Sequence, residues 1–301
     1  MSKKAFIEKT AEIIFFVCAV VAIFAVCAIT LYMFIKGTSA LREVGVSELI
    51  FGNRWQPTAE NPSYGIWYII LASLTGTGAA ILIGVPVGLL SAVFLSEIAG
   101  NTIGDLVRSA VELLAAIPSV IYGLIGMMVL NPVMFSIEKK IFENDSTHQY
   151  TGGANMLSAV IVLAIMILPT VISVSTSSLK AVPDNLRAAS LALGATREQT
   201  IFKTVIPAAK SGILTGVVLG IGRALGEAMA INMVAGGAVN IPLPFNSVRT
   251  LTTQIVSEMG YASGLHREVL FTVGLVLYIF IMIVNFILLK ARKGGYANGD
   301  K

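Results

Sequence analysis

Residues Met156–Ser178 read MLSAVIVLAIMILPTVISVSTSS, a stretch without a charged side chain. An α-helix needs about 20 consecutive apolar residues to cross the hydrocarbon core of a bilayer, and this stretch is long enough. Comparable apolar segments lie on both sides of it: Ile13–Ile35, Ile66–Leu95, Ala110–Phe135, Ser211–Val239 and Val269–Leu289. The short alternating segments of a membrane β-barrel are absent. The sequence therefore predicts an all-α integral membrane protein with six transmembrane helices.

The composition excludes an ordinary soluble protein. Hydrophobic residues make up 55% of the chain and charged residues 13%, whereas soluble domains carry about 25% charged residues. The net charge is +4, but the basic residues are scattered between apolar segments, which argues against a nucleic-acid partner. Cys18, Cys27, His148 and His266 show no metal-ligand spacing, so we expect no metal site.

Lys and Arg set the expected orientation of the spans. They are about twice as frequent in the termini, around Arg108 and in residues 180–210 as in the intervening loops, and cytoplasmic segments carry such an excess. Both termini are therefore expected in the cytoplasm. The first apolar segment has about 23 residues, more than the core of a signal peptide, so we interpret it as a retained helix. We divide the chain into an N-terminal helix with an external loop, a five-helix core and a cytoplasmic tail: residues 1–65, 66–290 and 291–301.

Three of the predicted spans contain a proline: Pro86, Pro118 and Pro169. Proline inside a membrane helix frees a carbonyl group, which neighbouring helices or water must satisfy. Because broken helices line substrate pathways in transporters, these prolines favour a transporter over a simple anchor.

The most informative loop comprises residues 180–210. Asp184 is expected to cap a first short helix and Gly194 to end it. Thr196–Gln199 has the capping-box spacing of a second helix, and Pro207 opens the next span. The first helix is apolar on one face, and an apolar face outside the membrane needs a partner or the headgroup layer. We therefore expect a docking surface here, although a plain linker would have the same outline.

Arg223 lies about 12 residues into the fifth predicted span, or roughly 18 Å along a helix, and so near the middle of the bilayer. An arginine there costs on the order of 2.5–3.5 kcal/mol and must face a partner or a water-filled cavity. Glu227 follows four residues later and is expected on the same helical face. Either the pair neutralises itself, or Arg223 meets an anionic substrate and Glu227 holds it when the site is empty. A guanidinium group suits a tetrahedral oxyanion because it can donate two hydrogen bonds.

Gly212, Gly216 and Gly220 recur at every fourth residue before this pair. Small residues with that spacing let membrane helices approach closely, so the fifth span is expected to pack tightly against another helix, with one across a pore dimer as a candidate. No Gly-x4-Gly-Lys-Ser/Thr loop occurs in the chain. We therefore expect it neither to bind ATP through that motif nor to act as an enzyme.

The loop at 180–210 resembles the coupling motif of ABC-importer permeases, Glu-Ala-Ala-x3-Gly-x12-Pro. The glycine, the proline and the first alanine match, whereas alanine replaces the glutamate and serine the second alanine. In that family the loop docks into the ATPase. The resemblance thus implies these ATPase-coupling residues: Leu186, Ala188, Ala189, Ser190, Leu193, Gly194 and Pro207.

Residues Gly222–Ala230, Gly-Arg-Ala-Leu-Gly-Glu-Ala-Met-Ala, resemble the PstC-type permeases of phosphate importers, and Ala116–Gly123 matches them as well. The chain is identified as a member of that family over nearly its whole length, in preference to the PstA-type sister subunit. The resemblance implies a type I, MetI-like permease architecture in the cytoplasmic (inner) membrane. It also implies that Arg223 and Glu227 lie on the phosphate pathway.

The same resemblance implies a heteromeric assembly in the lipid bilayer. One PstC-type and one PstA-type subunit would form the pore, with two ATPase subunits inside and a phosphate-binding protein outside. ATP and Mg would lie in the ATPases, and this chain would carry no cofactor. Its expected function is passage of inorganic phosphate by alternating access. Two alternatives stay open: a permease for another oxyanion (molybdate, sulfate or phosphonate), and an ion-coupled secondary transporter, which would usually show an internal repeat.

Overall fold

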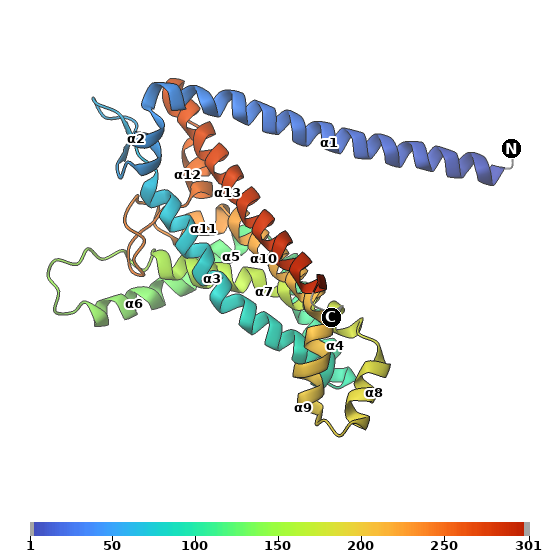
Figure 1. Ribbon diagram of the computed structural model, residues 1–301. Coiled ribbons are helices and arrows are strands. Elements are labelled where there is room, and N and C mark those ends of the chain that lie inside the picture. The colour runs from blue at the N-terminus through green and yellow to red at the C-terminus, as the bar shows by residue number, and fades with distance from the viewer. Residues whose placement is uncertain (1–2, 298–301) are drawn as a thin grey trace.

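The computed structural model describes the backbone of residues 3–297 and the side chains of residues 8–100, 102–287 and 290. Figure 1 shows a helical bundle from which the first helix diverges. Residues 291–297 of the expected tail prolong the final helix, and residues 298–301 lie outside the described residues.

Six helices within the described residues are long and apolar enough to cross a membrane, so the prediction of six spans is confirmed. Four of them are α1 (Lys3–Val44), α3 (Trp67–Val93, prolonged by the π-helical segment Phe94–Ile98), α7 (Met156–Lys180) and α13 (Gly264–Ala297). The third combines α5 (Ser119–Ile125), a π-helical segment (Gly126–Leu130) and α6 (Asn131–Ile141). The fifth combines α9 (Arg197–Thr200), a π-helical segment (Ile201–Val205) and α10 (Ile206–Gly226).

Shorter elements connect the spans. The helices among them are α2 (Val46–Phe51), α4 (Asn101–Ala116), α8 (Asp184–Ala192), α11 (Met229–Val234) and α12 (Leu251–Glu258). Strands β1 (Trp55–Gln56) and β2 (Ser63–Tyr64) form an antiparallel hairpin with Trp55 opposite Tyr64.

The third span does not begin where the sequence predicted. Residues expected at its start belong to α4, and the span begins at Ser119, after a break at Ile117 and Pro118. The proline ring disfavours the helical conformation for the preceding residue, and Ile117 is accordingly extended (φ −67°, ψ 125°). Pro118 therefore separates two helices, whereas Pro86 and Pro169 lie inside α3 and α7 as expected.

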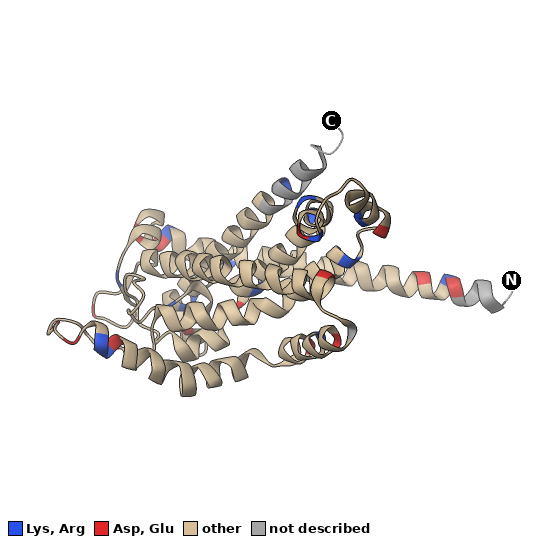
Figure 2. Cartoon of the chain, turned by 90° about the horizontal axis from the view of Figure 1, so that it is seen from below, with Lys and Arg blue, Asp and Glu red and all other residues tan. Residues whose placement is uncertain are grey.

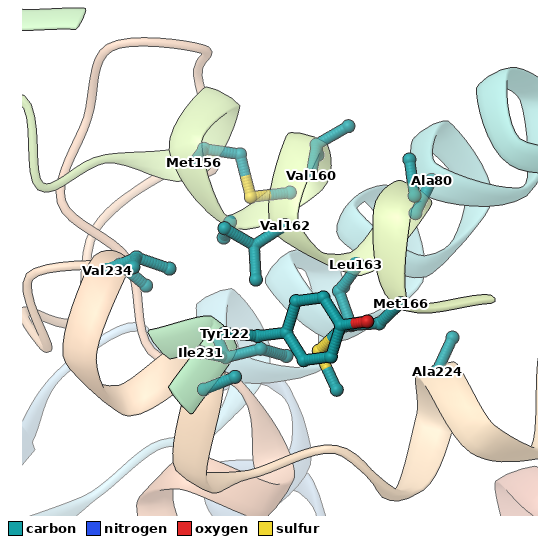
Figure 3. Close-up of a cluster of buried hydrophobic side chains, with 14 of the residues drawn as sticks. Ala80, Tyr122, Met156, Val160, Val162, Leu163, Met166, Ala224, Ile231 and Val234 are labelled. Carbon is teal, nitrogen blue, oxygen red and sulfur yellow. The ribbon is translucent and has the colours of Figure 1, made fainter. Parts of the chain in front are cut away.

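Helix α7 is the centre of the bundle, and both α3 and α10 pack against it. Figure 3 shows side chains of α7, among them Leu163 and Met166, gathered with Tyr122 of α5 and Ile231 of α11. Glycine makes the approach of α3 possible, because a Cβ atom on Gly84 would lie 2.6 Å from the Ile167 side chain. This close packing fixes the ends of α3, α7 and α10 relative to one another.

Helix α1 joins the bundle near its C-terminal end and diverges from it further back (Figure 1). Tyr32 packs edge-on against Phe271 with ring centroids 5.6 Å apart, and Thr272 donates a hydrogen bond to the Gly37 carbonyl (2.7 Å). The apolar stretch of α1 is otherwise exposed, and Phe15 is 73% accessible. Charged residues occur mainly near the helix ends and in the loops, and long stretches of the spans between them contain none (Figure 2).

Candidate functional site

Arg223 lies in the last turn of α10 and is partly exposed. Within the described residues its guanidinium group makes no ion pair or hydrogen bond. It interacts electrostatically with Tyr122 of α5. Tyr122 is buried, and its hydroxyl hydrogen is engaged in a hydrogen bond to the Leu114 carbonyl (2.7 Å). The C-terminal end of a helix favours a cation, and this stabilises Arg223 without a carboxylate partner.

Glu227 does not share a helical face with Arg223, and that expectation was wrong. Helix α10 ends at Gly226, and Glu227 has extended backbone (φ −75°, ψ 125°). Its carboxylate accepts a hydrogen bond from the Ala230 amide (3.0 Å), and its carbonyl accepts one from the Thr252 hydroxyl (2.7 Å). Helical i,i+4 spacing brings side chains together only while the helix continues, so the break separates the two charges.

The break between α10 and α11 is closely packed on the side where it contacts other helices of the same chain. The cavity beside it, lined by Ser73, Leu225 and Thr252 among others, measures about 10 Å³. Glu227 itself is 9% exposed. Both backbone groups of Glu227 are bonded within the chain, its carbonyl to the Thr252 hydroxyl and its amide to the Ala224 carbonyl, as irregular backbone in a membrane requires.

The loop at 180–210 forms a helical hairpin of α8 and α9, seen at the lower right of Figure 1. Gly194 joins the two helices with φ +83°, a conformation that other residues rarely adopt. The Thr196–Gln199 capping box is present. Asp184 differs from expectation: it is the first residue of α8, its side chain caps no backbone amide, and Pro183 occupies the cap position.

The outer face of the hairpin is apolar and exposed. Leu186, Leu191 and Leu193 are 42%, 50% and 90% accessible, and Ala188 and Ala189 are exposed as well. Ser190 instead faces α9, where its hydroxyl lies 3.0 Å from that of Thr200. Pro207 does not open the fifth span, and that expectation was wrong: the span begins at Arg197, and Pro207 lies inside it, just after the π-helical segment Ile201–Val205.

An ion pair that sequence reasoning missed attaches this hairpin to the end of α3. Arg187 of α8 donates two hydrogen bonds to the Glu97 carboxylate, at 2.8 and 3.3 Å. Hydrogen bonding to Glu97 raises the pKa of Arg187 above its ordinary value, against the opposite effect of burial. The sequence feature that could have indicated this pair is Glu97, a carboxylate that follows shortly after the apolar segment Ile66–Leu95.

The three glycines at every fourth residue face α7 of the same chain. A Cβ atom on Gly212 would lie 2.2 Å from the Ser178 hydroxyl oxygen. A Cβ atom on Gly216 would approach Val174 to 3.1 Å, and one on Gly220 would approach Val171 to 3.0 Å. Their contact is therefore with a neighbouring span of this chain.

A second network that the sequence did not reveal lies at the end of the bundle opposite the hairpin. The buried Glu258 carboxylate accepts hydrogen bonds from Trp55 (3.0 Å) and Arg249 (2.5 Å), and His266 Nε2 lies 2.8 Å from it. An open hollow of about 690 Å³ adjoins the network, with Tyr261 on its wall. The other histidine, His148, lies 2.9 Å from buried Glu138. Within the part of the chain that the structure describes, no three His, Cys, Asp or Glu side chains are grouped to hold a metal ion.

Residues 84–291 match the family model described as the binding-protein-dependent transport system inner membrane component. The chain belongs to this family. It is thus a multi-pass membrane permease, which agrees with its six spans.

Curated relatives cover most of the permease. A probable ABC transporter permease protein, YqgH of Bacillus subtilis (strain 168), is 38% identical over 289 residues, which are 93% of this chain and 90% of that protein. The phosphate transport system permease protein PstC of Xylella fastidiosa (strain 9a5c) is 35% identical over 90% of this chain and 87% of its own length. PstC of Pasteurella multocida (strain Pm70) is 34% identical over 78% and 76%. The resemblance to PstC-type permeases is confirmed.

Solved structures share the fold of the permease. A bacterial alginate ABC transporter in complex with an alginate-bound periplasmic protein has a TM-score of 0.63 and 14% identity, over 95% of this chain and 96% of that one. The MetNI methionine ABC transporter, in an inward-facing conformation, has a TM-score of 0.52 and 21% identity, over 77% and 94%. The predicted type I, MetI-like permease architecture is confirmed.

Proposed function

We propose that this permease is one of two pore-forming subunits of an ATP-driven importer of inorganic phosphate. Relatives named PstC, at 34–35% identity, support the substrate. The observation that carries the proposal is the guanidinium group of Arg223, which has no carboxylate partner within the described residues and lies where the fifth span breaks. Such a group can donate two parallel hydrogen bonds to a phosphate ion.

The expected partners follow from the same proposal. A PstA-type permease would complete the pore, and a phosphate-binding protein would deliver the ion from outside. One of the two ATPase subunits would dock on the exposed apolar face of this hairpin, which Leu186 and Leu193 supply. ATP-driven closure of the ATPases would move the hairpin, tilt the spans and expose Arg223 alternately to the two sides.

Within this proposal Arg223 and Glu227 have different tasks. Arg223 meets the passing anion, whereas Glu227 holds the break at α11 through its bond to Ala230 and does not neutralise the arginine. Molybdate, sulfate and phosphonate would be held by the same guanidinium chemistry, so the choice of phosphate rests on the PstC relatives.

The test is ATP-dependent uptake of radiolabelled phosphate into vesicles that carry the complete complex. We expect Arg223→Gln to slow uptake at least about tenfold, because a hydrogen bond to a charged group contributes about 1.5–3 kcal/mol. Arg42→Gln, at the exposed end of α1, is the matched control and should transport normally.

Two results would contradict the proposal. Normal transport by an assembled Arg223→Gln complex would make the arginine structural. Uptake of sulfate or molybdate in place of phosphate by the native complex would overturn the substrate.

A further inference from the structure

Helix α8 contributes no buried residue, although it carries most of the hairpin's exposed apolar face. Burial of apolar area therefore holds it only weakly. By contrast, the segment after α9 is embedded in an apolar cluster with the ends of α3 and α7, through Ile201 and Val205. Polar contacts must fix the position of α8 relative to the spans.

One side chain makes most of these contacts. Besides its two bonds to Glu97, Arg187 donates to the Leu179 carbonyl (2.9 Å) and the Val182 carbonyl (2.5 Å). A single guanidinium group thus joins α8, the C-terminal end of α7 and the end of α3. The side chains of Arg187 and Glu97 are 20% and 9% exposed, so water screens the pair only partly.

Glu97 is also the point where the second half of the hairpin is attached. Arg197 of α9 donates a hydrogen bond to the Glu97 backbone carbonyl. Glu97 lies in the π-helical segment that ends α3, where the regular hydrogen-bond ladder changes. Both halves of the hairpin therefore meet at one residue of the second span.

We propose that Arg187 and Glu97 are positioning residues that transmit the movement of the docked hairpin to α3 during transport. This inference rests on the proposed function, in which the hairpin docks on the ATPase. The planar fork of arginine bonds a carboxylate in two places and so resists both sliding and rotation. When α8 moves, the end of α3 moves with it, and α7 follows through the Leu179 carbonyl.

The first test compares phosphate transported per ATP hydrolysed by the complete complex in vesicles. Glu97→Gln and Arg187→Lys should assemble and hydrolyse ATP, while the ratio of phosphate to ATP falls roughly tenfold, because each leaves a largely buried charge or a carbonyl without its partner. Asp184→Asn is the matched control. Asp184 also contacts Arg187 (3.2 Å), but it is 99% exposed, so its loss should leave the ratio unchanged.

A cross-link separates a mechanical role from simple stabilisation. Cys18 and Cys27 are first replaced by alanine, and Glu97→Cys and Arg187→Cys are combined. The reduced double variant should hydrolyse ATP with little uptake, and a short bifunctional thiol reagent should restore the ratio. A cross-link that raised thermal stability without restoring uptake would overturn the inference, as would a native ratio in Glu97→Gln.

The proposed function and this link fail in different ways. If the native complex imports another oxyanion, the ratio is measured with that ion and still tests the link. If the native complex imports phosphate and the variants remain coupled, only the link is wrong.

Discussion

Glu227 shows at the scale of one residue how a charged group can be structural inside a transport protein. It is 9% exposed and accepts the Ala230 amide, so its oxygen acts as a helix cap at α11. Glu227→Gln keeps an acceptor oxygen and should leave the melting temperature of the purified complex unchanged. Glu227→Ala should lower it by about 2–4 °C, because a lost cap costs about 1 kcal/mol.

Glu60→Ala, in the exposed loop between β1 and β2, controls for loss of a glutamate and should have no effect. An equal fall in Glu227→Gln and Glu227→Ala would contradict the cap. It would instead mean that the negative charge matters, as an attraction to Arg223 would require.

At the scale of elements, the glycines of α10 set its distance from α7. A Cβ atom on Gly212 would lie 2.2 Å from Ser178 Oγ, which is itself bonded to the Val174 carbonyl (2.7 Å) and cannot easily move. Gly212→Ala should therefore lower the free energy of unfolding by about 1–3 kcal/mol, as overpacking does. Thermal denaturation of the detergent-purified chain measures this.

Gly222 lies on the same helix, but a Cβ atom there would meet nothing within 4 Å. Gly222→Ala should be neutral or stabilising by up to about 1 kcal/mol, because alanine favours the helix. Equal destabilisation by the two substitutions would show that helix flexibility, and not the contact with α7, is what these glycines provide.

At the scale of the whole molecule, the Glu258 network ties together segments that the chain brings from three regions. Trp55 belongs to the β1–β2 hairpin, Arg249 to the loop before α12 and His266 to α13. Glu258→Gln leaves Arg249, which is 20% exposed, without its charge partner, and we expect a cost below the roughly 3–5 kcal/mol of a fully buried pair. We expect a lower melting temperature and faster proteolysis at residues 52–66, measured on the intact complex.

Glu60→Gln, which changes an exposed glutamate in that same loop, should leave both measurements unchanged. If Glu258→Gln left proteolysis at residues 52–66 unchanged, the apolar contacts of Tyr64 and Ile66, and not the network, would be what holds the loop.

The sequence by itself determined the features that depend on local composition. Apolar segments of sufficient length predict six spans, because transfer into a bilayer depends on the apolar surface of each segment and not on its neighbours. Gly194 and the Thr196–Gln199 capping box of the hairpin could also be predicted, since helix caps depend on residues only a few positions apart.

Only the tertiary structure decided which charges meet. Arg187 and Glu97 are 90 residues apart in the chain, and no periodicity relates positions so distant. Arg223 and Glu227 are four residues apart, yet the helix breaks after Gly226, and Glu227 bonds the Ala230 amide and the Thr252 hydroxyl instead of Arg223. Helix ends inside a membrane depend on such distant partners, which is why spacing alone misplaced this pair.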